Sequence, residues 1–405
     1  MSNTLPRLRM NLDFMSSPLA DRPGLLIRDP YQYSDATLII PPALVEMLQF
    51  FDGQATDLDL RQALVRLTGD ISVGQLETHL IESLSDAGFL ENDIYEQLRE
   101  ARHSAFREAP VRLPAHAGTA YPDDSEEMRG WFAEEIGTPE PNGTPSGLIG
   151  IAAPHVSPEG GWESYRRAYR SLPADYKERI FVVLGTSHYG EADKFGLTRK
   201  PFRTPLGDSR TETSLVDWLA NQAPDATIME DYCHATEHSI EFQVALLQYV
   251  YGPDVRILPI LCGPYASSIV EGGRPEVNDS VNRFLGSLGE LHAKHENEIA
   301  WVLGVDMAHI GRRYGDQFSA QAYQAEMLDV SVRDKERIAC IEAGDSTGFW
   351  DLVQENQDDL KWCGASPIYT FLKAVPSAKA HMLNYQHWQI DPQSVVSFAA
   401  MQFTA

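Results

Sequence analysis

The chain has 405 residues, with 33 Lys and Arg against 58 Asp and Glu, so its formal net charge is −25. Hydrophobic residues make up 43% and charged residues 22%, which is typical of a folded globular protein and argues against a disordered chain. The acidic balance excludes the general basic footprint of a nucleic-acid-binding protein, and an anionic membrane surface would repel it. At this length two or three domains are expected.

The four cysteines are too few and too scattered for a disulfide framework, and no C-x-x-C pair occurs. We therefore expect four reduced thiols. The N-terminus has no continuous apolar stretch of the signal-peptide kind, and the longest apolar runs have the length of a strand rather than of a membrane span. These features favour a cytoplasmic protein without a membrane segment.

Residues 1–100 form the first predicted module. Apolar periodicity and turn residues predict two strands followed by three helices, at 25–30, 36–41, 43–51, 58–67 and 73–87. Thr56 is suited to cap the second of these helices, and Gly88 is suited to end the third. Two short strands followed by three helices predict a small winged-helix-like α+β domain.

The sequence of this module resembles that of PqqD-like domains, also called peptide recognition elements. The resemblance rests on F-F-D-G (50–53), T-x-L-D-L (56–60) and L-x-x-A-G-F-L (84–90). It implies that the module binds a leader peptide or a partner enzyme. The alternative is an accessory domain that only docks on its neighbour. Residues 91–114 are polar, so we expect a linker at 101–114 before a second domain over 115–405.

The second domain alternates strands with helices. Continuous apolar runs rich in β-branched residues predict strands covered on both faces, at 147–154, 179–186, 255–263 and 300–308. Helical periodicity lies between and around them, at 125–136, 162–172, 214–223, 239–251 and 281–295, and two strands are expected near the end, at 380–388 and 394–403. The expected fold class is α/β, with a central mixed sheet and helices on both faces.

Histidines follow three of the four predicted buried strands. His155 comes after the first strand, His188 after the second, and Asp306 and His309 after the fourth. Ligand sites of open α/β sheets lie outside the carboxyl ends of the strands, and imidazole is a common ligand of divalent metals. The pattern predicts a metal site, although each histidine alone could be a hydrogen-bonded structural residue. Asp306, His309, the 237–241 segment or a cysteine could complete it.

Cys363 is the cysteine best placed for such a role. It lies just before a predicted helix, whose dipole favours the thiolate, whereas a buried spectator thiol is the alternative. Residues 236–241 are predicted to open another helix, which would place Glu237 and Glu241 on one face with His238 close to Glu241. These acids could cap the helix or orient metal-bound histidines.

Other catalytic signatures are absent from the sequence. No G-x-G-x-x-G motif follows a strand, and neither a P-loop nor a G-x-S-x-G elbow occurs. A nucleotide-driven enzyme or an esterase is therefore not supported.

Read in order, several short motifs resemble the Memo family, also called AmmeMemoRadiSam system protein B. The motifs are H-A-G-T-A-Y-P (116–122), I-A-A-P-H (151–155), L-G-T-S-H (184–188), F-R-T-P-L-G-D (202–208), E-H-S-I-E-F-Q (237–243), L-P-I-L-C-G (258–263), V-D-M-A-H-I-G (305–311) and W-C-G-A-S-P-I (362–368). The resemblance implies a fold similar to class III extradiol dioxygenases over 115–405. It also implies metal ligands at His155, His188 and Cys363, with Asp306 and His309 in the same pocket.

By this resemblance His309 is the expected acid/base, and Asp306 is expected to orient it or to bind the metal. His116, Glu237, His238 and Glu241 are expected around the metal or the substrate. Two departures from the family affect the pocket: Val156, Ser157 and Pro158 replace a family A-G-Y, and Ile310 replaces an aromatic residue.

The predicted function is that of a non-haem Fe(II) oxidoreductase, dioxygenase-like, with Cu or Zn as alternative metals because thiolate is a soft ligand. The resemblance implies a radical SAM protein and a small companion protein as partners. Two alternatives stay open. One is a non-catalytic protein that binds metal or recruits a peptide or partner. The other is a zinc-type hydrolase with Glu241 or His309 as base.

Overall fold

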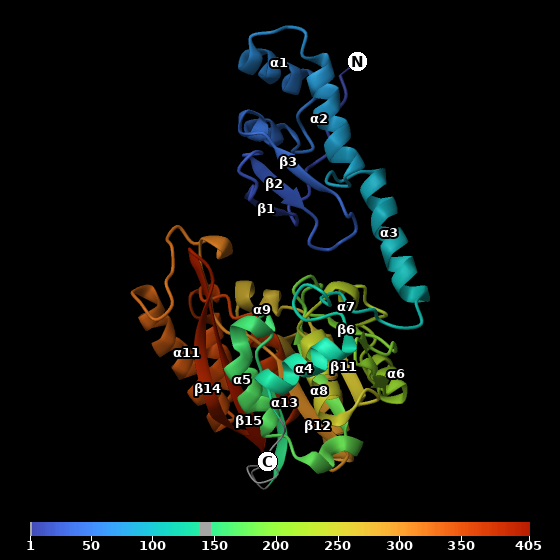
Figure 1. Cartoon of the computed structure of the whole chain (residues 1–405), viewed down its shortest axis with the longest axis vertical. Helices are drawn as coiled ribbons and strands as arrows, with labels where there is room; N and C mark the ends of the chain where they lie inside the picture. The colour runs from blue at the N-terminus through green and yellow to red at the C-terminus, as the bar shows by residue number, and fades with distance from the viewer. Residues whose placement is uncertain (1, 138–146) are drawn as a thin grey trace. The chain divides into compact units, whose positions relative to one another are not determined.

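The computed structural model describes residues 2–137 and 147–405, and the chain divides into two compact units, 1–108 and 109–405 (Figure 1). The first unit contains a three-stranded antiparallel sheet followed by helices. Its elements are β1 (Asp13–Ser16), β2 (Leu25–Arg28), β3 (Thr37–Ile40), the 3-10 helix η1 (Pro42–Phe50), α1 (Asp57–Thr68), α2 (Gly74–Asp86) and α3 (Asp93–Glu108). The predicted strands and the first three helical segments are present.

The caps of the first unit explain where its helices begin and end. The Thr56 side chain accepts from the backbone N–H of Asp59, and the Asp59 carboxylate accepts from the Thr56 N–H, which forms a capping box. Gly88 follows α2 with a φ of 69°, a left-handed conformation that favours glycine. Arg9 and Asp29 form a buried ion pair at 3.0 Å beside the core.

The linker prediction was wrong for most of its length. Residues 93–108 form α3, so the linker expected at 101–114 is helical up to residue 108, and the boundary between the units, at 108/109, falls within the predicted range. The segment looked like a linker because Phe106 is the one fully buried residue of this helix, and its other side chains are largely polar. Asn92 accepts from the N–H of Tyr95 and caps the helix, a start signal that the polar composition obscured.

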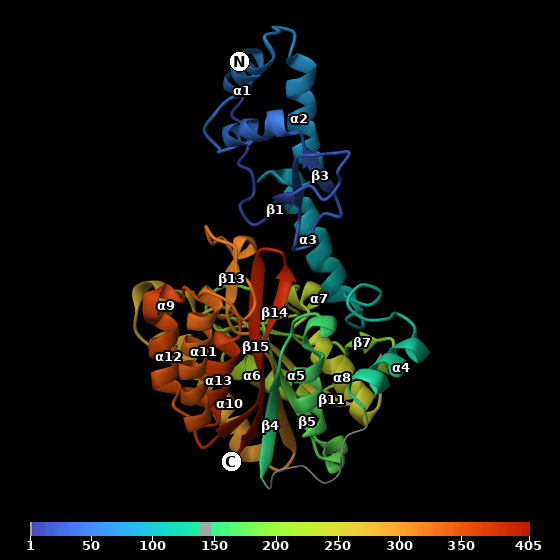
Figure 2. The same cartoon turned by 60° about the vertical axis from the view of Figure 1, so that its left-hand side comes forward.

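The second unit is built on a mixed ten-stranded sheet (Figure 2). The parallel centre runs in the order β11 (Arg256–Cys262), β5 (Ile180–Thr186), β12 (Ile299–Gly304), β4 (Leu148–Ala153). The long strand β15 (Ser394–Thr404) pairs antiparallel with β4, and β14 (Lys379–Asp391) pairs antiparallel with β15. The shorter strands are β6 (Phe195–Leu197), β9 (Arg210–Thr211), β10 (Thr227–Met229) and β13 (His309–Gly311), and β7 (Arg203–Thr204) and β8 (Gly207–Asp208) form a separate pair.

Helices cover both faces of this sheet. The first face carries α4 (Ser125–Glu135), α5 (Pro158–Arg170) and α8 (Glu241–Tyr251). The second carries α6 (Thr213–Gln222), α10 (Asp279–His295), α11 (Glu326–Ala343), α12 (Ser346–Gln354) and α13 (Ala365–Ala374). The short segments are α7 (Cys233–Thr236), α9 (Ala266–Glu271), η2 (Ala174–Glu178), η3 (Pro275–Val277), η4 (Arg312–Tyr314) and η5 (Glu355–Gln357).

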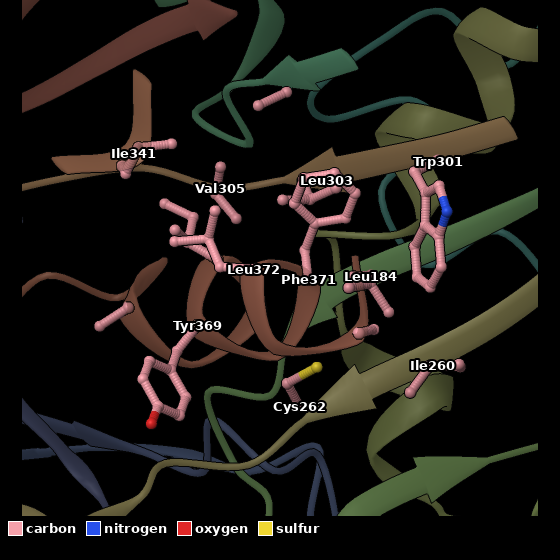
Figure 3. Packing of buried hydrophobic residues seen from close by; sticks show 14 of the residues in the cluster. Leu184, Ile260, Cys262, Trp301, Leu303, Val305, Ile341, Tyr369, Phe371 and Leu372 are labelled. Carbon is pink, nitrogen blue, oxygen red and sulfur yellow. The ribbon is translucent and has the colours of Figure 1, made fainter. Parts of the chain in front are cut away.

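Residue alternation along the strands explains why both faces are apolar. Leu184 of β5 and Leu303 of β12 belong to the core under α13, and their neighbours Val183 and Val302 belong to the opposite core. Figure 3 shows Phe371 of α13 packed among residues of the core under α13. The prediction of an α/β unit with a mixed sheet and helices on both faces is therefore confirmed.

The strand order also fixes where a site can form. The chain leaves β5 toward β11, on one side of the sheet, and leaves β12 toward β15, on the other side. The carboxyl ends of β5 and β12 thus flank a switch point, where crossover connections leave a crevice. No helix of the described residues is long and apolar enough to span a bilayer, and no disulfide joins the four cysteines, all of which lie in the described part.

Candidate metal centre

His155 lies at the centre of the site that forms at this edge. It follows β4 and is 1% exposed. Its Nδ1 is 2.9 Å from the carbonyl oxygen of Gly304. Because a carbonyl only accepts hydrogen bonds, the neutral ring donates through Nδ1 and presents the lone pair of Nε2. That Nε2 lies 3.2 Å from the Sγ of Cys363 and 3.4 Å from an Oδ of Asp306.

His188 follows β5 and is oriented by Glu237. The Nδ1 of His188 lies 3.0 and 3.1 Å from the two carboxylate oxygens, and its backbone N–H donates to the same group at 2.9 Å. Nε2 is therefore the nitrogen left for a metal, and the ring centroid lies 5.0 Å from that of His155. Burial lowers the pKa of His188, but the carboxylate of Glu237 and the thiol of Cys363 outweigh burial and raise it well above its usual range.

Cys363 is held in place by its neighbours on the chain. Its carbonyl accepts from the Thr186 hydroxyl at 2.9 Å, and the N–H of Gly364 donates to the carbonyl of Asp306 at 3.0 Å. Burial alone would raise the pKa of the thiol, but the imidazoles of His155 and His188 lower it below its ordinary value. The thiolate, which is the metal-binding form, is thus favoured.

Asp306 and His309 complete the cluster from the end of β12. Asp306 accepts the backbone N–H of His155 at 2.9 Å, and burial raises the pKa of its carboxyl to about 6. His309 places Nδ1 at 2.9 Å from the carbonyl of Met307, so its Nε2 is the atom left to exchange a proton. Burial lowers the pKa of His309, which keeps the ring neutral.

His238 lies among the possible metal ligands, although it was expected only around the metal or the substrate. Its ring stacks on His188 with centroids 5.0 Å apart and meets His155 at 5.1 Å. Two overlapping groups could therefore hold an ion, with donor atoms within 4.8 Å of one another: His155, His188 and His238, or His155, Asp306 and Cys363. Burial lowers the pKa of His238 well below its usual range, so a neutral ring is available as a ligand.

The expected pairing of Glu237 and Glu241 on one helix face was wrong. Helix α8 begins at Glu241, and Glu237 sits in extended backbone after the short helix α7. The two carboxylates therefore serve different partners. Glu237 binds His188, whereas Glu241 forms a fully buried ion pair with Arg112.

The Glu241 carboxylate organises the segment that enters the second unit. It also accepts the backbone N–H groups of Ala115 and His116, both at 3.0 Å, and the hydroxyl of Tyr121. His116 itself bonds the Thr236 carbonyl at 3.0 Å through Nε2, and its ring lies 5.6 Å from that of His238. His116 thus lies behind His238 in the wall of the site.

A buried carboxylate that the sequence did not reveal connects two parts of the site. Asp334 of α11 is fully buried and accepts from Trp362 Nε1 at 2.7 Å and from the Ser397 hydroxyl at 2.6 Å. Trp362 precedes Cys363, and Ser397 accepts the backbone N–H of Ala308 at 2.9 Å. Asp334 therefore fixes both the cysteine loop and the turn between Asp306 and His309. An acid midway along an amphipathic helix carried no sequence signal of this role.

Tyr314 was also missed. Its ring meets His309 edge-on at 4.9 Å. It supplies an aromatic side chain near the position where Ile310 departs from the family pattern, and it belongs to the small apolar cluster around Val156. Burial raises the pKa of its phenol, so Tyr314 presents a neutral hydroxyl.

The donor set fits a first-row transition metal. Two ligands of one ion, at the usual Zn–N and Zn–S distances of about 2.1 and 2.3 Å, lie roughly 3.2–3.6 Å apart. The separation of 3.2 Å between His155 Nε2 and Cys363 Sγ falls in that range. The other nitrogen of His155 and of His188 is hydrogen-bonded to an acceptor, as in protein metal sites where outer partners orient the ligands.

Fold and site together define an α/β protein with a histidine, cysteine and aspartate cluster at the carboxyl edge of its sheet. Residues 112–402 match the Memo-like protein family, and the chain belongs to that family. It is 26% identical over 403 residues to a MEMO1 family protein of Aquifex aeolicus, covering 98% of this chain and 99% of that protein. A MEMO1 family protein of Methanopyrus kandleri is 28% identical over 310 residues, covering 72% of this chain and 98% of that protein.

Among solved structures, an uncharacterized protein from Escherichia coli K12 aligns with a TM-score of 0.38 and 11% identity, over 63% of this chain and 99% of that chain. The family expected from the ordered motifs is confirmed. The similarity to extradiol dioxygenases and the PqqD-like character of the first unit stay predictions.

Proposed function

We propose that the second unit binds a transition metal ion through His155, His188 and Cys363 and uses it as an oxidoreductase. The observation that carries this proposal is the convergence of His155 Nε2 on Cys363 Sγ at 3.2 Å, with the opposite nitrogen of the imidazole fixed by a carbonyl. Fe(II) is the ion we favour, with Cu and Zn as the alternatives that a thiolate ligand permits. His238 is the alternative third ligand.

When bound, a ferrous ion supplies one-electron and oxygen chemistry that protein side chains lack. The residues of the chain supply the rest. Glu237 holds the His188 ring in one tautomer, and Asp306 fixes the backbone of His155. His309 is neutral and keeps Nε2 free, so it is suited to accept a proton from a substrate and return it. The radical SAM protein and the small companion protein remain the expected partners, with a peptide at the first unit.

Nitric oxide binding tests this function directly, because nitric oxide is an O₂ analogue that needs an open position on the metal. We expect the anaerobic Fe(II)-loaded chain to give the half-integer-spin EPR signal of a ferrous nitrosyl centre, and we expect His155→Ala to lose it. A wild-type chain that holds iron but gives no such signal would contradict an oxygen-activating centre. Full Zn content with no affinity for iron would favour the hydrolase instead.

A further inference from the structure

A cavity of about 260 Å³ opens beside the metal centre at the carboxyl edge of the sheet. The ends of β5 and β11, helices α9 and α12, and the loop that leads through Cys363 into α13 form its walls. His188 and Cys363 line it, so a molecule inside would lie against two of the proposed ligands. An apolar cavity of about 150 Å³ holds benzene, so this one has room for one ring with a small substituent.

Most of the cavity wall is apolar. Tyr265, Trp350 and Trp362 line it, and each is at most 2% exposed. Their polar atoms are hydrogen-bonded to residues outside the cavity, at 2.7, 2.8 and 2.7 Å to Thr370, Ser268 and Asp334. What these side chains present to the cavity is therefore ring carbon, which favours an apolar body in the ligand.

One end of the cavity is polar and attracts anions. Ser366 lines the cavity in the first turn of α13 and is 6% exposed, yet within the described chain neither its hydroxyl nor its backbone N–H makes a hydrogen bond. The Ser366 hydroxyl is therefore available to donate to an acceptor that a ligand supplies. The N-terminus of the ten-residue helix adds a partial positive charge at the same place.

Charged side chains around this end do not reverse that preference. Lys361 lines the cavity while its Nζ bonds Asp316 at 2.9 Å. The one lining carboxylate, Asp358, accepts the backbone N–H of Trp362 at 3.1 Å through one oxygen, while its other oxygen is buried without a hydrogen bond and lies 3.9 Å from Arg337. The guanidinium of Arg337 offsets the negative charge of Asp358, so this carboxylate does not exclude an anion at the start of the helix.

We propose that this cavity binds a small organic monoanion with an apolar body of about one ring, its oxyanion accepting from the hydroxyl and N–H of Ser366. Because the cavity is lined by His188 and Cys363, this assigns the substrate class of the metal centre, and to that extent it rests on the proposed function. Recognition of the anion itself depends only on the cavity walls.

The probe for this proposal is para-fluorobenzoate, titrated into the full chain and followed by fluorine NMR, with para-fluorobenzyl alcohol as the uncharged comparison. We expect the carboxylate to bind more tightly than the alcohol. Ser366→Ala should weaken the carboxylate about tenfold, the effect of one hydrogen bond to a charged group, and leave the alcohol unchanged. Equal affinity for the two probes would overturn the proposed anion site.

A second pair of variants locates the binding. Ile269→Trp should fill the cavity and abolish binding, whereas Val270→Trp, on the same helix but 70% exposed and outside the cavity, should not. Binding that survives Ile269→Trp would overturn the assignment. Metal content is measured on the same sample. Binding by a chain that takes up no metal would therefore refute the metal centre and leave the cavity assignment standing.

Discussion

Replacing Glu237 by Gln should lower the affinity for metal, and a matched variant distinguishes this effect from a loss of folding stability. Glu237 is 1% exposed and accepts the backbone N–H groups of His188 and His238 at 2.9 Å, that of Ser239 at 3.1 Å, and the Nδ1–H of His188 at 3.0 Å. The glutamine amide keeps one acceptor oxygen, but its NH₂ group is a donor and faces N–H groups that also donate. The His188 ring therefore loses its fixed orientation. Loss of a residue that hydrogen-bonds a metal-binding histidine in this way lowers metal affinity about 10–100-fold.

Glu241→Gln is the matched comparison, four residues further along the chain. Glu241 touches none of the proposed ligands, but its partner Arg112 is fully buried, and breaking a buried ion pair costs about 3–5 kcal/mol. We therefore expect Glu237→Gln to lose about 10–100-fold in Zn(II) affinity. Glu241→Gln should lose mainly free energy of unfolding.

The assays are chelator-competition titration with Zn(II) and urea unfolding of the metal-free chain. If Glu237→Gln bound Zn(II) as tightly as the wild type, the role of Glu237 in orienting His188 would be refuted. An equal loss of affinity in a folded Glu241→Gln chain would refute the division of roles between the two acids.

Three further outcomes are expected. Asp334→Asn should broaden the thiolate-to-metal absorption of the Co(II)-substituted chain, because the cysteine loop loses an anchor; an unchanged spectrum would contradict the role of Asp334. Burial lowers the pKa of His234 to about 4, whereas the unfolded value is about 6.5. Its contribution to stability is therefore complete above pH ~6.5 and is lost toward pH ~4 by up to ~1.4 kcal/mol per pH unit, so urea unfolding of His234→Gln should show a shallower decline. Thr56→Ala should destabilise the first unit by ~1 kcal/mol through loss of the capping box, measured by hydrogen exchange of α1, and unchanged exchange would contradict that.

The central sheet was predictable because buried parallel strands have a local signature. Three of the four predicted apolar runs became strands within a residue at each end, and the run at 300–308 became a strand that ends at Gly304. The residues after these strands, including His155 and His188, met at one edge because strand ends of a parallel sheet must. The cap at Thr56 was equally local. Secondary structure and the core of the site thus followed from short stretches of sequence.

Contacts between distant segments could not be read in this way. Arg112 and Glu241 are 129 residues apart, so nothing near Glu241 revealed that its carboxylate faces a buried guanidinium rather than the metal. The position of Asp334, between the loop of Trp362 and the strand of Ser397, likewise depends on packing of α11 against the sheet. Helix α3 was missed for another reason: its composition is largely polar and charged, and only Phe106 is buried.

Metal content of the anaerobically purified chain tests the central claim most directly. Inductively coupled plasma mass spectrometry would compare the wild type with His155→Ala and with His295→Ala, a control at an exposed ion pair on α10. We predict about one transition metal ion per chain, iron above all, in the wild type and in His295→Ala, and its loss in His155→Ala. Full metal content in His155→Ala, or no metal in any of the three, would contradict the metal centre.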